Sequence, residues 1–288
     1  MKILVTGASG NVGKYVVKSL LQMGLPTVAA GTNIKRLKTE FGGKVDFVML
    51  DFQDQHTFSE ALKGINRVFL MRPPHLGKPE DLYPFIDAMK KENIQMVCFL
   101  SLMGVESNPL PPHHKIEKYI EHVGLPFAHL RPGFFMQNLS GIHSKEIQEK
   151  NEIFVPAGNS RTSFIDAEDI GLSAATLLQQ YNQYQNTTHT ITGSESLSYY
   201  EIAEILSQVS GRTIKYVKPS ILKYRNHYIQ QRNIPKAYVH VTVALYLMTR
   251  LGTAKHITDD FFRLTNQQPR TFREFAQSNQ DIFERVNT

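Results

Sequence analysis

Three glycines near the start of the chain constrain its fold more than any other feature. Gly7, Gly10 and Gly13 recur every three residues directly after an apolar run at residues 2–6, which predicts a strand. Residues 11–23 carry valine and leucine at helical spacing and predict a helix. A strand, a glycine turn and a helix form the unit that holds a dinucleotide pyrophosphate at a helix start. We therefore predict a working dinucleotide site, with an empty Rossmann-like fold as the weaker alternative.

Each glycine has its own task in such a unit. The first permits the tight turn, the second lets the pyrophosphate approach the backbone, and the third lets the helix pack closely on the sheet. The predicted cofactor contacts in this turn are Thr6, Gly7, Ser9, Gly10, Asn11, Val12 and Gly13.

The first half of the chain alternates short strands with helices. Several expected strands are apolar throughout, as in a sheet that is covered on both faces. The alternation implies βαβ crossovers, so the predicted fold class is α/β, a Rossmann-type doubly wound parallel sheet. The expected strands are 2–6, 27–31, 45–50, 67–71, 96–101 and 127–131, and the expected helices are 11–23, 34–41, 55–62, 80–92 and 113–123.

This rhythm breaks in the second half, which predicts a smaller C-terminal α+β lobe. Ser198 and Glu201 have the spacing of a capping box and mark the start of a helix. The expected strands there lie within 153–165, at 188–192 and at 212–217, and the expected helices are 166–180 and 198–209. We predict a dinucleotide-binding domain over 1–152, to which 163–193 returns, and a substrate or lid lobe formed by 153–162 and 194–288.

The end of the second expected strand indicates which dinucleotide binds. NAD sites usually place an acidic residue there to accept the ribose hydroxyls. This chain has Thr32, Asn33, Lys35 and Arg36 in that region and no acid. A hydroxyl, an amide and two cations suit the 2′-phosphate of NADP, so NADP is favoured over NAD. The alternative is that the two cations only begin a solvated helix.

The ends of later strands supply further predicted cofactor contacts. Asp51 and Phe52 follow the third strand and are expected at the adenine edge. Met71, Arg72 and Pro73 follow the fourth strand, where the chain must pass near the cofactor.

Composition is typical of a soluble globular protein. Apolar residues make up 41% of the 288 residues, and no apolar stretch approaches the roughly 20 residues of a membrane span. The N-terminus lacks the pattern of a signal peptide. Cys98 is the single cysteine and lies in an apolar run. We therefore predict a buried structural thiol and a reducing, cytoplasmic setting.

The positive charge is concentrated in one segment. Residues 212–256 contain nine Lys or Arg and no Asp or Glu, and the net charge of +6 becomes −3 when these nine cations are left out. Tyrosines are interleaved with the cations, which is a pattern of single-stranded nucleic-acid binding. The cations are scattered, so we favour a helical lid whose cationic face draws anionic ligands toward the cleft.

Three blocks of the sequence resemble a known family. They are TGASGNVG, the block His113–Leu139 (HHKIEKYIEHVGLPFAHLRPGFFMQNL) and the block Val155–Gly171 (VPAGNSRTSFIDAEDIG). The first resembles the extended and atypical short-chain dehydrogenase/reductases, and all three together resemble the NmrA-like branch. That branch includes NAD(P)H-dependent quinone reductases, azoreductase-like proteins and cofactor-sensing regulators.

The resemblance also exposes a departure from the larger family. Ordinary relatives carry a Tyr-x-x-x-Lys pair on the helix after the fifth strand. Counting back from Glu117 puts His113 at the lysine position and Pro109 at the tyrosine position, so the usual tyrosine acid is absent. We expect His113 to have a pKa near neutrality and to assist proton delivery, with Lys115 as the weaker candidate. A capping or packing role for His113 is the alternative.

The resemblance further implies where the nicotinamide and the substrate lie. It places a serine at the end of the fifth strand, a Pro-Gly-Phe turn after the sixth strand beside the nicotinamide, and the substrate next to that turn. The residues at these positions are Ser101, Pro132, Gly133, Phe134, Phe135 and Asn138. The phenylalanines are equally well explained as core residues, and no residue is assigned to a metal.

These features lead to two hypotheses of different classes. The first is an NAD(P)H-dependent oxidoreductase that transfers hydride to a quinone-like or other conjugated small molecule, since hydride transfer is the chemistry of the cofactor itself. The second is a non-catalytic, NADP-sensing regulator that binds a protein partner. The sequence leaves a homodimer open, makes nucleic-acid binding through residues 212–256 the weakest of the hypotheses, and indicates no membrane partner.

Overall fold

The computed structural model describes residues 2–284, which form two compact units. Unit 1 consists of the chain up to Pro132, Ala167–Ile191 and Asp259–Gln267, and unit 2 consists of Gly133–Asp166, Thr192–Thr258 and the chain from Gln268 onward. The predicted domain boundary at residue 152 thus falls inside unit 2. The segment Asp259–Gln267, which the sequence pattern assigns to the smaller lobe, belongs to unit 1, where Asp260 accepts a hydrogen bond from the Thr190 amide (2.8 Å).

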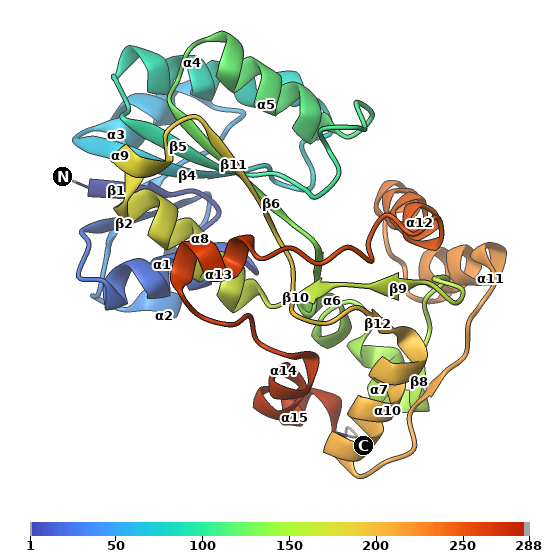
Figure 1. The fold of residues 1–288 in the computed structure, drawn as a ribbon. Coiled ribbons are helices and arrows are strands. Elements are labelled where there is room, and N and C mark those ends of the chain that lie inside the picture. Colours follow the sequence, from blue (N-terminus) through green and yellow to red (C-terminus); the bar gives the residue numbers. More distant parts are fainter. Residues whose placement is uncertain (1, 285–288) are drawn as a thin grey trace. The chain divides into compact units, whose positions relative to one another are not determined.

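Unit 1 is built on a parallel sheet, shown in Figure 1. Within residues 2–284 this sheet has seven strands in the order β11-β6-β5-β4-β1-β2-β3. Their bounds are β1 (Lys2–Val5), β2 (Thr27–Gly31), β3 (Asp46–Met49), β4 (Ile65–Met71), β5 (Met96–Leu100), β6 (Phe127–Pro132) and β11 (Thr187–Ile191). The chain order reverses between β1 and β4, the switch point at which open α/β sheets bind ligands.

Helices cover both faces of this sheet, and the predicted doubly wound fold is confirmed. They are α1 (Gly13–Gln22), α2 (Ile34–Phe41), η1 (Gln55–Thr57), α3 (Phe58–Leu62), η2 (Pro79–Leu82), α4 (Tyr83–Lys91), α5 (Pro112–His122), α8 (Ala167–Gln179), α9 (Tyr181–Tyr184) and α13 (Asp260–Thr265). Buried Phe85, Ile86 and Ile116 join α4 and α5 to one face of the sheet. On the other face, α8 crosses α1 so closely that a Cβ on Gly171 would lie 2.5 Å from the Cβ of Tyr15.

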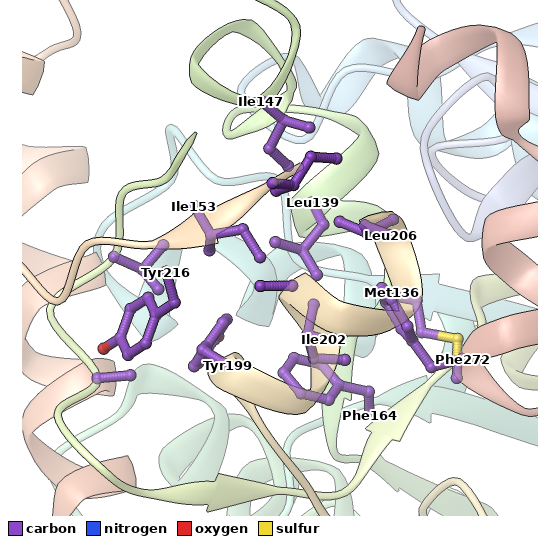
Figure 2. Packing of buried hydrophobic residues seen from close by; sticks show 14 of the residues in the cluster. Met136, Leu139, Ile147, Ile153, Phe164, Tyr199, Ile202, Leu206, Tyr216 and Phe272 are labelled. Carbon is purple, nitrogen blue, oxygen red and sulfur yellow. The ribbon is translucent and has the colours of Figure 1, made fainter. Parts of the chain in front are cut away.

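Unit 2 contains short strand pairs and helices around its own core. Its elements are β7 (Phe134–Phe135), α6 (Gln137–Ser140), α7 (Ser144–Lys150), β8 (Glu152–Ile153), β9 (Arg161–Thr162), β10 (Phe164–Ile165), β12 (Leu197–Ser198), α10 (Tyr199–Ser210), β13 (Lys215–Tyr216), α11 (Ile221–Asn226), the π-helix η3 (His227–Gln231), α12 (Lys236–Arg250), α14 (Phe272–Ser278) and α15 (Gln280–Phe283). The predicted capping box is confirmed, since Ser198 and Glu201 exchange side-chain and backbone hydrogen bonds at the start of α10. Figure 2 shows Ile202 and Leu206 of α10 packed among Leu139 and Ile153.

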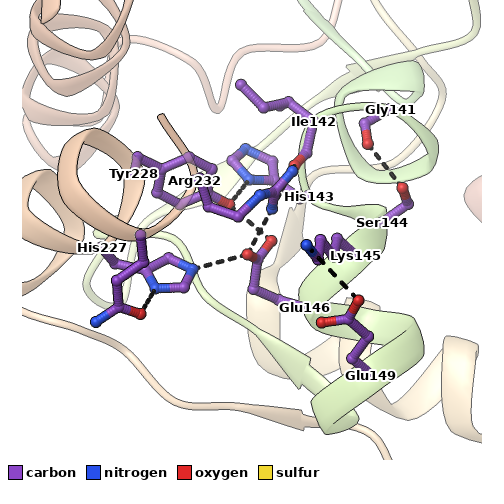
Figure 3. Close-up of polar contacts among 11 residues, drawn as sticks. Gly141, Ile142, His143, Ser144, Lys145, Glu146, Glu149, His227, Tyr228 and Arg232 are labelled. Carbon is purple, nitrogen blue, oxygen red and sulfur yellow. Dashed lines mark hydrogen bonds and ion pairs between the residues drawn. The ribbon is translucent and has the colours of Figure 1, made fainter. Parts of the chain in front are cut away.

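A buried polar network lies within unit 2, as Figure 3 shows. Glu146 on α7 is only 2% exposed and contacts His227 Nε2 at 2.7 Å, Arg232 Nη1 at 2.5 Å and the Tyr228 hydroxyl at 3.1 Å. Nδ1 of His143 lies 2.6 Å from the same Tyr228 hydroxyl. Burial would raise the pKa of Glu146, but hydrogen bonds from Arg232 and His227 hold that pKa below its usual range. The network therefore ties α7 to η3 through a buried charge pair.

Two further predictions concern single features. Cys98 on β5 is fully buried and its burial raises the pKa of the thiol, so the prediction of a buried structural thiol is confirmed. Among the helices within residues 2–284, none is both long and apolar enough to cross a membrane.

Candidate dinucleotide site

The glycine turn between β1 and α1 has a geometry that only glycine permits at two of its positions. Gly7 has a φ of +59°, and a Cβ there would lie 2.7 Å from Sδ of Met71. A Cβ on Gly13 would overlap the carbonyl oxygen of Gly7. The amide of Gly10 donates to that same carbonyl at 2.9 Å and closes the turn. The backbone is thus folded tightly under the start of α1, as a pyrophosphate site requires.

The start of α1 offers unused hydrogen-bond donors. The helix begins at Gly13 after Val12, without a side-chain cap and without an acidic residue in its first turn. Within residues 2–284, the amides of Asn11, Val12 and Gly13 donate to no protein acceptor. Free amides at the positive end of a helix form an anion site. The turn therefore suits a phosphate group.

Thr6 and Ser9 contribute to this turn in different ways. Thr6 is buried, and its Oγ1 accepts a hydrogen bond from the Met71 amide at 3.0 Å. Its side chain thus links β1 to β4. Ser9 accepts a hydrogen bond at its carbonyl oxygen from Nη2 of Arg36 at 3.1 Å. Of the predicted cofactor contacts, Thr6 is therefore bonded to β4 and Arg36 to the glycine turn.

The end of β2 presents polar and cationic groups. Asn33 caps α2, since its Oδ1 accepts from the Arg36 amide at 3.0 Å. Thr32 and Lys35 are exposed beside it, and the first turn of α2 has no acidic residue. Because its Nη2 is bonded to Ser9, the Arg36 guanidinium is held next to the glycine turn. This arrangement holds a cation at the end of β2, beside the glycine turn. Its contact with a 2′-phosphate stays a prediction.

The residues predicted after β3 and β4 mainly shape their own loops. Oδ1 of Asp51 accepts from the Gln53 amide at 2.9 Å, and the Phe52 ring packs edge-on against Phe85. Arg72 donates to the carbonyl of Pro73 at 3.2 Å and to that of Leu76. Burial lowers the pKa of Arg72, with Asp81 opposing the shift.

His113 lies in the first turn of α5, where the expectation of a near-neutral pKa is wrong. Burial lowers its pKa to about 3, the charge of Arg72 adds to the shift, and Glu117 opposes it. The ring stacks on Phe99 with 6.0 Å between centroids, and its buried Nδ1 has no hydrogen-bond partner within residues 2–284. At neutral pH His113 is therefore a neutral imidazole that can hydrogen-bond but holds no spare proton. Lys115, two residues on, is exposed.

The sequence analysis missed a buried cluster next to this histidine. Glu117 is 1% exposed and accepts two hydrogen bonds from Arg131, at 2.9 and 2.6 Å. Burial would raise the pKa of Glu117, but the hydrogen bonds from Arg131 hold that pKa below its usual range. Ligand-type atoms of Glu117, Glu121 and His129 lie within 4.8 Å of one another, as in a metal site. Glu117 already forms an ion pair with Arg131, and Glu121 forms one with Lys118 at 2.7 Å. Because cations of the protein pair with both carboxylates, we interpret the cluster as structural.

The remaining predicted residues are divided between the units. Ser101 is buried after β5, and Pro132 ends β6, both in unit 1. In unit 2, Phe134 and Phe135 form β7, which pairs with β10, and they are partly buried. Gly133 precedes them and Asn138 lies on α6. Contact of any of these residues with cofactor or substrate stays a prediction.

The sheet and its glycine turn define a class, the Rossmann-type α/β proteins that carry a dinucleotide-binding motif. Within that class the chain belongs to the NmrA-like family, whose sequence model matches residues 1–276. The resemblance inferred from the three sequence blocks is thereby confirmed.

Individual relatives are similar over more than nine tenths of their length. The chain is 31% identical over 283 residues to the prestalk A differentiation protein A of Dictyostelium discoideum, covering 96% of this chain and 92% of that protein. It is 27% identical over 287 residues to the NAD(P)H azoreductase of Xenophilus azovorans, covering 98% and 99%. The solved structure of an Escherichia coli NADPH-dependent quinone oxidoreductase complexed with NADPH has a TM-score of 0.86 at 19% identity, covering 98% and 99%. The similarity to this solved structure supports the Rossmann-type fold of the chain.

Proposed function

We propose that this protein is an NADP(H)-dependent oxidoreductase that transfers hydride to a quinone-like or other conjugated small molecule. The observation that carries the proposal is the glycine turn, whose unused amides lie next to a guanidinium fixed on Ser9. The names of relatives that span the chain, an NAD(P)H azoreductase among them, support the same activity.

The residues of unit 1 divide the work of holding the cofactor. The amides of Asn11, Val12 and Gly13 would bind the pyrophosphate, since they face no protein acceptor within residues 2–284. Arg36 would pair with the 2′-phosphate as a planar, charged donor, with Lys35 as a second cation nearby. The bound nicotinamide would supply the hydride.

His113 limits the class of acceptor. With its pKa lowered to about 3, the imidazole is neutral across the physiological range and cannot act as a protonated acid. The family resemblance puts Pro109 at the position of the usual tyrosine acid, and proline has no hydroxyl. An electron-poor conjugated acceptor does not need an acid in the hydride step, because charge is delocalised over its own framework. An ordinary ketone does need one, so we exclude simple carbonyl reduction from the proposal.

Steady-state assays test this proposal. We expect the purified chain to oxidise NADPH through many turnovers against at least one member of a quinone panel, with little activity on simple ketones. NADPH should bind at least tenfold more tightly than NADH when both are titrated by nicotinamide fluorescence. Tight NADPH binding without turnover on any acceptor would contradict the proposed oxidoreductase activity and favour the NADP-sensing regulator.

The role of Arg36 can be tested separately. Arg36→Ala should weaken NADPH binding about 10- to 100-fold and NADH binding less than threefold, because a charge-assisted hydrogen bond contributes about 1.5–3 kcal/mol. Arg263→Ala is the matched control, since Arg263 is an exposed arginine of unit 1 that pairs with Asp259 at 2.8 Å. An equal loss for both nucleotides would show that Arg36 acts through Ser9 on the shape of the turn rather than on the 2′-phosphate.

A further inference from the structure

Unit 2 has a cationic pocket that the proposed function does not use. The pocket has a volume of about 310 Å³ and is lined by Gly158, Asn159, Ser160, Lys218 and Arg250. Three of these residues belong to the turn between β8 and β9. The other two come from the segment 212–256, which has no acidic residue.

The two cations of the pocket lack carboxylate partners. Within residues 2–284, the guanidinium of Arg250 forms no hydrogen bond and no ion pair with protein groups. Nζ of Lys218 donates to Oδ1 of Asn159 at 2.7 Å and meets no acid in the same range. Arg161, which follows the pocket residue Ser160, has an acidic partner of its own in Glu201, at 2.9 Å. Two positive charges thus converge on a space that no negative side chain neutralises.

The pocket is also preorganised. Gly158 has a φ of +66°, and a Cβ there would lie 3.1 Å from Nε of Arg250, so the arginine lies directly against the turn. The Ser160 hydroxyl donates to the carbonyl of Ala157 at 2.7 Å and fixes the turn. Lys218 has a φ of +44°, a left-handed conformation that is uncommon for a residue other than glycine. Retained strain of this kind is typical of binding sites.

One exposed apolar side chain neighbours Arg250 on the surface of α12. Arg250 is the last residue of α12, and Leu247, one helical turn earlier, is 43% exposed. Residues three apart are neighbours on a helix surface. A ligand held by Arg250 would therefore have the exposed hydrocarbon of Leu247 beside it.

We infer that this pocket binds the oxyanion group of a small molecule with an apolar body, such as an aromatic sulfonate, carboxylate or phosphate. The planar guanidinium of Arg250 matches two oxygens of such a group, and the Lys218 ammonium supplies a second charge. The ligand is either the acidic substituent of the acceptor, which rests on the proposed function, or a separate organic anion. Both sources share the same recognition chemistry.

Binding measurements on the full chain test the site without relying on activity. Benzenesulfonate, titrated by isothermal calorimetry at constant ionic strength, should bind more tightly than inorganic sulfate, and benzyl alcohol should not compete. Arg250→Ala and Lys218→Ala should each weaken benzenesulfonate at least tenfold without changing the far-ultraviolet circular dichroism. Lys236→Ala, at the opposite end of α12, is the matched control and should leave affinity unchanged. The proposed binding site would be overturned if the wild type and both pocket variants bound benzenesulfonate equally well. It would also be overturned if Lys236→Ala lost as much affinity as the pocket variants.

Measurements of KM distinguish the two sources of the anion. If the oxyanion belongs to the acceptor, Arg250→Ala raises the KM of a sulfonated quinone about tenfold and leaves that of its neutral parent unchanged. If it belongs to a separate ligand, both KM values stay unchanged while benzenesulfonate binding is still lost. Absence of turnover on every acceptor would contradict the proposed function alone, since the calorimetric result stands independently of it.

Discussion

Replacement of Glu146 by alanine is expected to lower the free energy of unfolding of unit 2 by about 3–5 kcal/mol. The carboxylate is 2% exposed and pairs with Arg232 at 2.5 Å and with His227 at 2.7 Å. Its removal leaves the largely buried guanidinium of Arg232 without a counter-charge, and it also deprives the Tyr228 hydroxyl of its acceptor. Breaking one side of a buried pair costs more than the pair contributes net, because the remaining charge stays desolvated.

The chain offers a control for this variant on the same helix. Glu149 lies on α7 and faces Lys145 at 3.8 Å, with both side chains about half exposed (Figure 3). Glu149→Ala should change the stability by less than about 0.5 kcal/mol. Glu146→Gln keeps the shape of the side chain and one acceptor oxygen. Its loss of stability should therefore fall between those of Glu149→Ala and Glu146→Ala.

Urea unfolding followed by hydrogen exchange with peptide resolution measures these effects separately in the two units. Only the peptides of unit 2 should lose protection in Glu146→Ala. Comparable losses for Glu146→Ala and Glu149→Ala would show that the buried network does not stabilise the fold. The chain has no tryptophan, so exchange is a better probe here than intrinsic fluorescence.

Local sequence signals were enough to predict most of unit 1. The strands and helices of the first half follow from hydrophobic periodicity, and the glycine turn follows from its place between β1 and α1. The capping box at Ser198 is equally local, since both partners lie within four residues. Features of this kind depend on neighbours in the chain, which a single sequence displays.

Features that depend on distant neighbours could not be predicted in this way. The pKa of His113 is set by burial and by Arg72, 41 positions earlier in the sequence, so its residue type alone suggested a near-neutral pKa that the structure corrects. The Glu146 network joins residues that are 81 to 86 positions apart. The cationic pocket of unit 2 likewise combines the turn at Gly158 with Arg250. No periodicity or spacing marks such pairs, because packing alone brings them together.

Acidification should destabilise both units well above the range in which carboxylates titrate. Burial lowers the pKa of His113 to about 3 and those of His129 and His143 to about 4. For His129, Arg131 adds to this effect while Glu117 and Glu121 oppose it. For His143, Arg232 adds to it while Glu146 opposes it. All three imidazoles are therefore neutral in the folded chain until the solution is strongly acidic.

The sign of the effect follows from proton binding. An unfolded histidine has a pKa of 6.5 and takes up a proton as the pH falls through that value, whereas these folded histidines do not. Their contribution to stability is fully present above pH 6.5 and is lost progressively as the pH falls toward the folded values. Each histidine should lower the free energy of unfolding by about 1 kcal/mol between pH 7 and pH 5.5. Unit 1 holds two of them and unit 2 holds one, so unit 1 should lose more.

Stability curves at pH 7.0, 6.5, 6.0 and 5.5 check this prediction when hydrogen exchange reports each unit. His143→Gln should make the pH dependence of unit 2 shallower by about one proton while leaving that of unit 1 unchanged. Leu139→Ala, which removes buried apolar volume from the core of unit 2, should lower its stability equally at every pH. If His143→Gln and Leu139→Ala behaved alike, the acid sensitivity of unit 2 would arise from general weakening of the core. If the pH dependence of stability changes only in His143→Gln, the acid sensitivity of unit 2 comes from the proton that the buried imidazole does not bind.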